Sequence, residues 1–194
     1  WNLKGNYWLA IGYFEKCLEA MKTATVPPHF PIVVNDNLSI IYINLHLFDK
    51  ALFYASGSLR LAEEAGDEAT IGTACQHIGS AYLGLEQKDK ALSYFQRAVD
   101  IARKLNYPRL FTTAISNVAE IYSFKGDHKK AKALYEEGLK ASREHEDQEG
   151  LVYNLHGLSL EAFNDSNYPA AKQYAKEGLK WAQQMELSSY SYAL

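Results

Sequence analysis

The feature that most constrains the fold is an internal repeat with a period of forty residues. It is plainest in a column of alanines, at Ala51, Ala91, Ala131 and Ala171. Neighbouring columns keep the same spacing, with small residues at Ser58, Ala98, Gly138 and Gly178 and bulky ones at Tyr54, Tyr94, Leu134 and Tyr174. A chain that repeats in this way is expected to form similar units that stack, because one unit cannot bury its apolar face alone.

Each repeat divides into two segments with the apolar spacing of an α-helix. In the first segment the apolar residues follow at steps of three and four, as from Leu38 to Tyr42. Such steps place the side chains on one helical face. A short polar connector, such as the one around Gly126, separates the two segments. We therefore expect every repeat to be a pair of antiparallel helices, with Asp127 and Asn167 as N-caps of second helices.

The same period sets the expected repeat boundaries. A partial repeat at 1–26, complete repeats at 32–71, 72–111, 112–151 and 152–187, and the start of a further repeat at 188–194 make up one expected domain. The prolines within residues 23–31 predict one irregular junction. Because repeats depend on their neighbours for stability, two incomplete ends predict that the chain is part of a longer protein.

Composition narrows the choice of partners. The 194 residues carry a net charge of -3 with a pI near 6.1, and the basic residues are spread among acidic ones. Neither nucleic acid nor an anionic membrane is therefore an expected partner. No stretch reaches the roughly 20 apolar residues that a membrane helix needs. We expect a cytoplasmic protein, or a periplasmic one if the full-length protein is a membrane sensor.

The sequence offers little chemistry. It contains no HExxH, CxxC or GxSxG motif. His77 and His156 are one position out of register along their first helices, which argues against a shared metal site. Cys17 and Cys75 lie among apolar neighbours and are expected to be reduced packing residues. We therefore predict that the chain is not an enzyme and has no catalytic residues, no metal and no cofactor.

The repeat resembles the tetratricopeptide repeat. In residues 72–111 the matching positions are Ile78, Gly79, Tyr82, Ala91, Phe95 and Ala98. The resemblance implies an all-α, right-handed superhelical solenoid of antiparallel helix pairs. Two features depart from the family, whose usual period is about 34 residues. The period here is forty, and the proline that ends the family's second helix is replaced by Glu63, Arg103, Arg143 and Gln183. Both departures resemble the longer repeats of kinesin light chains, LGN-like adaptors, and bacterial peptide receptors and sensor regions.

In the resembling family, first helices line a concave groove, and five positions on each face the ligand. Carried onto this sequence, these positions are Val33, Asp36, Asn37, Ile40 and Asn44; Thr73, Gln76, His77, Ser80 and Leu83; Thr113, Ser116, Asn117, Glu120 and Phe124; and Tyr153, His156, Leu160, Phe163 and Asn164. The peptide-binding residues expected among them are Asn37, Asn44, Gln76, His77, Asn117, Glu120, Phe124, Tyr153, His156 and Phe163. None of the twenty is Lys or Arg, so the carboxylate clamp of chaperone-binding members is not expected.

The resemblance leaves alternatives open. Asn37 and Asn117 stand where long-repeat members place asparagines that hold a ligand backbone, since an amide both donates and accepts. They could equally bond neighbouring helices within the solenoid. The expected function is a scaffold that binds a protein or an extended peptide. The alternative is a sensory or regulatory region of a larger bacterial signalling protein, such as a transcription regulator, histidine kinase or cyclase.

Overall fold

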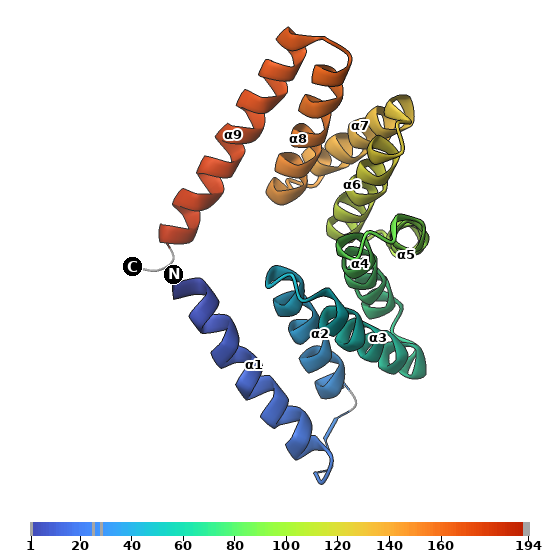
Figure 1. Ribbon diagram of the computed structural model, residues 1–194, viewed down its shortest axis with the longest axis vertical. Coiled ribbons are helices and arrows are strands. Elements are labelled where there is room, and N and C mark those ends of the chain that lie inside the picture. The colour runs from blue at the N-terminus through green and yellow to red at the C-terminus, as the bar shows by residue number, and fades with distance from the viewer. Residues whose placement is uncertain (1, 25, 28, 192–194) are drawn as a thin grey trace. The chain divides into compact units, whose positions relative to one another are not determined.

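The computed structural model describes residues 2–24, 26–27 and 29–191, and the side chains of residues 6–24, 26–27 and 29–185. Over this part of the chain the structure has helices and no strand (Figure 1). The helices are α1 (Asn2–Met21), α2 (His29–Asn44), α3 (Phe48–Ala65), α4 (Glu68–Gly84), α5 (Lys88–Lys104), α6 (Pro108–Phe124), α7 (His128–Glu144), α8 (Gln148–Asn164) and α9 (Tyr168–Ser191). The predicted all-α repeat solenoid is confirmed. None of the described helices has both the length and the hydropathy needed to cross a bilayer.

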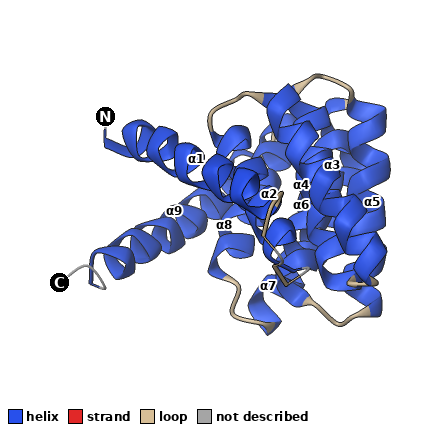
Figure 2. Ribbon diagram, turned by 90° about the horizontal axis from the view of Figure 1, so that it is seen from below, coloured by secondary structure: helices blue, strands red, loops and turns tan. Residues whose placement is uncertain are grey.

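The chain forms two compact units, residues 1–101 and 102–194, and the division falls within α5. In the first unit α2 pairs with α3, and in the second α6 pairs with α7 and α8 with α9. The first helices of successive repeats also pack together, α2 with α4 and α6 with α8. The loops that join the helices are short (Figure 2). Each unit is therefore built from helical hairpins whose first helices are neighbours.

Every connector from α2 to α9 contains one residue in the left-handed region. These residues are His46, Gly66, Glu86, Asn106, Gly126, Glu146 and Ser166. A left-handed residue ends a helix because it turns the next backbone N–H groups towards the last carbonyls. After α6, for example, the N–H of Gly126 donates to Ser123 O and that of Asp127 to Tyr122 O, both at 2.9 Å. The forty-residue period thus extends to the backbone of the turns.

The two predicted N-caps are confirmed. Asp127 accepts a hydrogen bond of 3.1 Å from a backbone N–H in the first turn of α7. Asn167 does the same for α9 at 3.3 Å. Asp67 and Asp147 cap the first helices α4 and α8 in this way, each at 3.1 Å. Side-chain oxygens therefore satisfy N–H groups that a helix start would leave without partners.

Small residues lie where large side chains of a neighbouring helix come close. A Cβ atom added to Gly79 of α4 would lie 2.6 Å from the ring of Phe95 on α5. One added to Gly157 of α8 would lie 2.3 Å from the ring of Tyr135 on α7. Ala131, in the alanine column, is completely buried. Gly79, whose column is small throughout, and Gly157, whose equivalents are Asn37, His77 and Asn117, thus leave space for the aromatic rings that pack on them.

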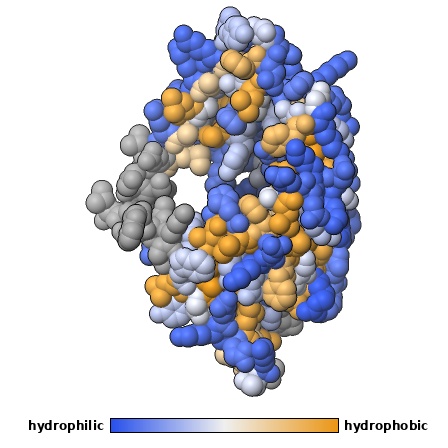
Figure 3. All heavy atoms as spheres, viewed as in Figure 1, coloured by the Kyte–Doolittle hydropathy of each residue, from blue (hydrophilic) through white to orange (hydrophobic). Residues whose placement is uncertain are grey.

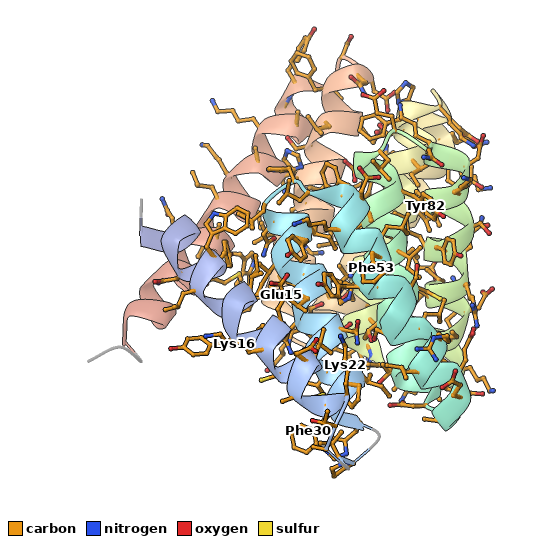
Figure 4. The ribbon with its side chains drawn as sticks, turned by 60° about the horizontal axis from the view of Figure 1, so that its bottom comes forward. Glu15, Lys16, Lys22, Phe30, Phe53 and Tyr82 are labelled. Atoms are coloured by element: carbon orange, nitrogen blue, oxygen red, sulfur yellow. The ribbon has the colours of Figure 1, made fainter. Side chains whose placement is uncertain are left out.

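Tyrosines join the helices of the first unit. The rings of Tyr42 and Tyr54 stack with their centroids 5.4 Å apart, and those of Tyr82 and Tyr94 do so at 5.7 Å. Glu15, which projects from α1 (Figure 4), accepts a hydrogen bond from the Tyr42 hydroxyl at 3.2 Å. Burial, together with the charge of Glu15, raises the pKa of Tyr42 to about 12. Tyr42 is therefore a neutral donor that ties α2 to α1.

Ion pairs join successive second helices at positions 34 residues apart. The pairs are Glu63–Arg97 at 2.7 Å, Arg103–Glu137 at 2.8 Å and Arg143–Glu177 at 2.8 Å. In the first pair the carboxylate is on the earlier helix, and in the other two it is on the later helix. Equivalent ion pairs thus join the second helices, but the acidic and the basic residue exchange places between the first pair and the other two.

Three expectations meet different outcomes. The irregular junction predicted within residues 23–31 lies between the end of α1 at Met21 and the start of α2 at His29, whereas Pro31 belongs to the first turn of α2 and interrupts no helix. Cys75 is buried, and burial raises its pKa to about 11. The prediction that Cys17 packs in the core is wrong, because its side chain is exposed on α1. The equivalent residue Ala98 is covered within its hairpin, whereas no described helix pairs with α1 in that way.

At the C-terminal end, α9 runs on to Ser191 and passes the repeat boundary expected after residue 187. Residues 192–194 of the expected further repeat lie outside the described residues, as does residue 1 of the partial repeat. The division of the chain into repeats at 1–26 and 188–194 stays a prediction.

Candidate peptide-binding surface

In the second unit the predicted binding residues share one side of two neighbouring helices. We call this side the α6–α8 surface, and it consists of Asn117, Glu120 and Phe124 on α6 and Tyr153, His156, Leu160 and Phe163 on α8. Four of its apolar side chains are strongly exposed, namely Phe124 (56%), Tyr153 (58%), Leu160 (50%) and Phe163 (61%). The structure therefore places these residues on two helices that pack together, and their four apolar side chains are exposed.

Glu120 is the charged group of the α6–α8 surface. Its side chain is half-buried, and no hydrogen bond or ion pair to it is found among the described residues. Burial raises the pKa of Glu120, and the nearby imidazole of His156 opposes this with a smaller effect. Tyr135 lies close enough for the charge of Glu120 to add to the burial that raises the pKa of Tyr135. Glu120 is thus partly removed from water without a compensating partner.

The two asparagines differ. The Asn37 side-chain amide donates to the Val33 carbonyl of its own helix at 2.8 Å, so this N–H group braces no neighbouring helix. The Asn117 side chain is partly buried, and no partner for its amide is found in the described part of the chain. Asn117 is therefore available to pair with a peptide backbone, and this role remains a prediction.

In the first unit, His77 is engaged within the fold. Its Nδ1 lies 2.9 Å from Asp36 Oδ1 and 3.2 Å from Ser39 Oγ, which links α4 to α2. Asp36 was itself expected to face a ligand. His77 and Asp36 therefore interact with each other, and either side chain could bind a ligand only if this contact between α4 and α2 were broken.

The other predicted residues of the first unit are more accessible or lack a partner. Asn44 is exposed, and its amide donates to the Tyr7 hydroxyl at 3.4 Å. The Gln76 Oε1 atom is buried and has no hydrogen-bond partner within the described residues. Val33 and Ile40 of α2 are 50% and 38% exposed. Figure 3 shows hydrophobic residues gathered around α2.

A buried polar network in the second unit was not anticipated from the sequence. Asn154 is completely buried in α8, and its Oδ1 accepts from Ser116 Oγ at 2.9 Å. Its amide donates to Gly150 O at 2.8 Å. Ser116, which was expected to face the ligand, is therefore buried. The sequence did contain a signal for the burial of Asn154, because the equivalent residues of the other repeats are the apolar Val34, Ala74 and Ala114.

Glu161 is a second buried polar residue that no sequence motif indicated. Its side chain is 1% exposed. Ser123 Oγ donates to Oε1 at 2.5 Å, and His128 Nδ1 lies 2.8 Å from Oε2. The carboxylate therefore connects α8 to both helices of the preceding hairpin.

Other candidate sites in the second unit lie apart from the predicted residues. A pocket of about 530 Å³ is lined in part by Tyr107, Arg109, His145, Glu149 and Met185. An ion pair of 3.1 Å joins Arg109 to Glu149 across it. None of the predicted binding residues lines this pocket. No group of His, Cys, Asp and Glu suited to a metal ion is found among the described residues.

Comparison with known proteins identifies the repeat and the fold. Residues 72–105 and 113–145 match the family model described as tetratricopeptide repeat. Among curated proteins, none matches the sequence.

Solved structures with the same fold share little sequence with the chain. The Bacillus subtilis aspartyl phosphate phosphatase F is 15% identical with a TM-score of 0.80, over 91% of this chain and 46% of that one. A Rap protein complexed with Competence and Sporulation Factor is 19% identical with a TM-score of 0.76, over 96% and 53%. A putative kinesin light chain from Podosopora anserina with TPR-like repeats is 13% identical with a TM-score of 0.70, over 94% and 89%.

The chain thus spans about half the length of the first and second of these proteins. The similarity concerns the fold, and it agrees with the hairpins, the small-residue columns and the two matched repeats described above. On these grounds residues 72–105 and 113–145 are similar to tetratricopeptide repeats, and the described residues have the fold of helical-repeat proteins.

Proposed function

We propose that the chain is a protein-interaction scaffold that binds an extended peptide segment of a partner on its first helices, with the α6–α8 surface as a principal contact. Tetratricopeptide repeats and the structural similarity to a Rap protein complexed with Competence and Sporulation Factor support the scaffold function. The surface supports the more specific part of the proposal. Binding of this kind needs no catalytic group.

The observation that carries the proposal is a row of exposed apolar side chains on a helix whose other face is core. Tyr153, Leu160 and Phe163 occupy one side of α8, whereas Leu155 and Leu158 on the same helix are buried. Single exposed apolar residues are common, but a contiguous row on one face is typical of an interaction site. Aromatic residues are also enriched in contacts that dominate binding energy.

Asn117 provides the polar part of the proposed contact. An extended peptide presents unpaired N–H and C=O groups, and an amide side chain can pair with either. Asn117 lies on α6, which packs against α8, and it is seven residues before Phe124 on the same side of its helix. Backbone pairing would bind peptides largely irrespective of sequence, and the apolar row would add selectivity.

The test uses peptides selected from a displayed library against the intact chain, with affinities measured by fluorescence anisotropy. We expect Tyr153→Ala and Phe163→Ala each to weaken binding by about 1–2 kcal/mol. We expect Asn117→Ala to weaken it by about 0.5–1.5 kcal/mol. The control is Phe53→Ala, because Phe53 is 71% exposed but lies on a second helix. Unchanged affinity in all three surface variants, or an equal loss in the control, would contradict the proposal.

A second candidate function is a sensory or regulatory region of a larger signalling protein. The observation that favours it is a structural similarity to part of a much larger protein. The chain aligns with 28% of the length of a signal transduction ATPase from Pyrococcus horikoshii that has a tetratricopeptide repeat sensor. The full-length reading frame tests it. A frame that encodes only further repeats would remove this candidate.

A further inference from the structure

The charges of the α6–α8 surface are one-sided. Among the ten first-helix positions predicted to face a ligand in this unit, Glu120 is the one carboxylate and none is Lys or Arg. His156 is the remaining titratable residue with a basic side chain. A ligand on this surface would therefore meet a carboxylate and no guanidinium or ammonium group from these positions.

Glu120 also differs from other buried or half-buried acids of the second unit in having no partner. Glu161 is bonded to Ser123 and His128, and Glu177 pairs with Arg143 at 2.8 Å. No such contact to Glu120 is found among the described residues. A carboxylate that is partly removed from water and left unpaired is unfavourable, which agrees with the raised pKa of Glu120.

The surroundings of Glu120 define what could contact it together with its carboxylate. Phe124 lies one helical turn further along α6, and residues four apart occupy the same side of a helix. The adjoining α8 contributes His156, whose charge acts on Glu120, and Leu160, which occupies the equivalent position of its own repeat. The carboxylate thus shares its side of α6 with the exposed Phe124, and the adjoining α8 has exposed apolar side chains of its own.

We propose, resting on the function proposed above, that Glu120 anchors a cationic side chain of the bound peptide, so that the ligand carries a Lys or Arg next to apolar residues. A cation would form a charge-assisted hydrogen bond and restore the favourable interactions that the carboxylate has lost to burial. An acidic peptide would instead be repelled by Glu120 and would find no basic partner among the ten positions. The ligand is therefore a basic and apolar segment.

Two amidated, N-acetylated nonapeptide libraries test the proposal. Both contain random Phe, Leu, Tyr, Ser and Gly at the other positions, and they differ only in a central arginine or its neutral isostere citrulline. Binding of each library to the immobilised full chain is measured for wild type, Glu120→Gln and Glu136→Gln. Glu136 is the matched control because it is an exposed glutamate on the second helix α7.

We expect the wild type to retain the arginine library at least tenfold more strongly than the citrulline library, because a hydrogen bond to a charged group contributes about that factor. The ratio should fall towards one in Glu120→Gln and stay unchanged in Glu136→Gln. Equal retention of both libraries by the wild type, abolished by Phe163→Ala, would overturn the cation anchor and leave the peptide-binding function standing. Retention of neither library would overturn both.

Thermal unfolding supplies a readout that a structural role of Glu120 would move in the opposite direction. Because the folded state raises the pKa of Glu120, the ionised carboxylate destabilises the fold at neutral pH. Glu120→Gln should therefore raise the melting temperature while it weakens arginine binding. A lowered melting temperature would show that Glu120 supports the fold, and would overturn its assignment as a ligand anchor.

Discussion

Glu161 is an acidic residue in a position that the rest of the protein fills with apolar side chains. The equivalent residues in the earlier repeats are Ile41, Ala81 and Ile121, all of them buried. A buried carboxylate is tolerated only where hydrogen bonds replace the lost water. Ser123 and His128 provide these hydrogen bonds. They offset the cost of burying a carboxylate where the other repeats have an apolar residue.

This arrangement predicts a difference between two substitutions. Glu161→Ala leaves a cavity and removes the partner of Ser123 and His128, and we expect it to lower the free energy of unfolding by about 2–4 kcal/mol. Glu161→Leu fills the space and restores the apolar column, so we expect it to stay within about 1 kcal/mol of wild type. Urea denaturation followed by circular dichroism measures both. A larger loss for leucine than for alanine would contradict the packing argument.

At this scale the sequence predicted what depends on local chemistry. Asp127 and Asn167 cap helices as expected, because capping requires only the residue and the turn that follows. Cys17 and Asn37 were less predictable. The exposure of Cys17 depends on which helix covers α1, and the amide of Asn37 bonds within its own helix. Such outcomes are set by neighbours in space that a pattern of residue types does not contain.

Among the elements, the connectors are alike in backbone and different in residue type. Gly126 and Glu86 occupy the same position of successive repeats, with φ values of 80° and 60°. Glycine adopts such angles without steric conflict, whereas a residue with a Cβ atom does so less readily. The turn is therefore fixed by the hairpin geometry, and some repeats adopt it with a less suitable residue.

Substitutions at these two positions should act in opposite directions. We expect Gly126→Ala to lower the free energy of unfolding by about 1 kcal/mol, and Glu86→Gly to raise it by about 0.5–1 kcal/mol. Gly12→Ala is the control for the substitution itself. Gly12 lies within α1 with open space around it, so alanine there should stabilise the helix by about 0.5–1 kcal/mol. Thermal denaturation of the three variants checks the signs, and a stabilised Gly126→Ala protein would refute the argument.

The helices themselves were largely predictable because their columns recur, and the end of α9 shows where this reasoning stops. The forty-residue period predicted a boundary after residue 187, yet α9 continues to Ser191. Residues 186–191 contain no glycine or proline. Nothing local ends the helix there, and the repeat boundary itself stays a prediction.

For the whole molecule, contacts between neighbouring hairpins imply that stability is local. Asn154 bonds to Ser116 of the preceding repeat and to its own helix. In repeat proteins, a defect is felt mainly by the adjoining repeats. We expect Asn154→Ala to increase hydrogen exchange in α6–α9 and to leave α2 and α3 nearly unchanged, as measured by mass spectrometry. An equal increase in α2 and α3 would show that the chain unfolds as a single cooperative body.

The fold of each unit was thus predictable from the forty-residue period. For the candidate site, the sequence predicted which side of each helix is exposed but not which side chains bond to one another. The sequence placed Tyr153 and Phe163 on an exposed side of α8, as the structure has them. It did not show that His77 is engaged by Asp36 or that Ser116 is buried. These outcomes depend on hydrogen bonds between polar side chains of different helices, which cannot be inferred from a residue's position in the repeat.

The reversed polarity of the ion pair between α3 and α5 makes the order of the repeats matter. Deleting residues 72–111 would bring Glu63 opposite Glu137, and duplicating them would bring Arg103 opposite a second Arg97. Each exposed pair contributes only about 0.2–1 kcal/mol, but exchange would replace attraction by repulsion at the same contact. The repeats share the same columns, but the charges at these contacts determine which repeat can follow which.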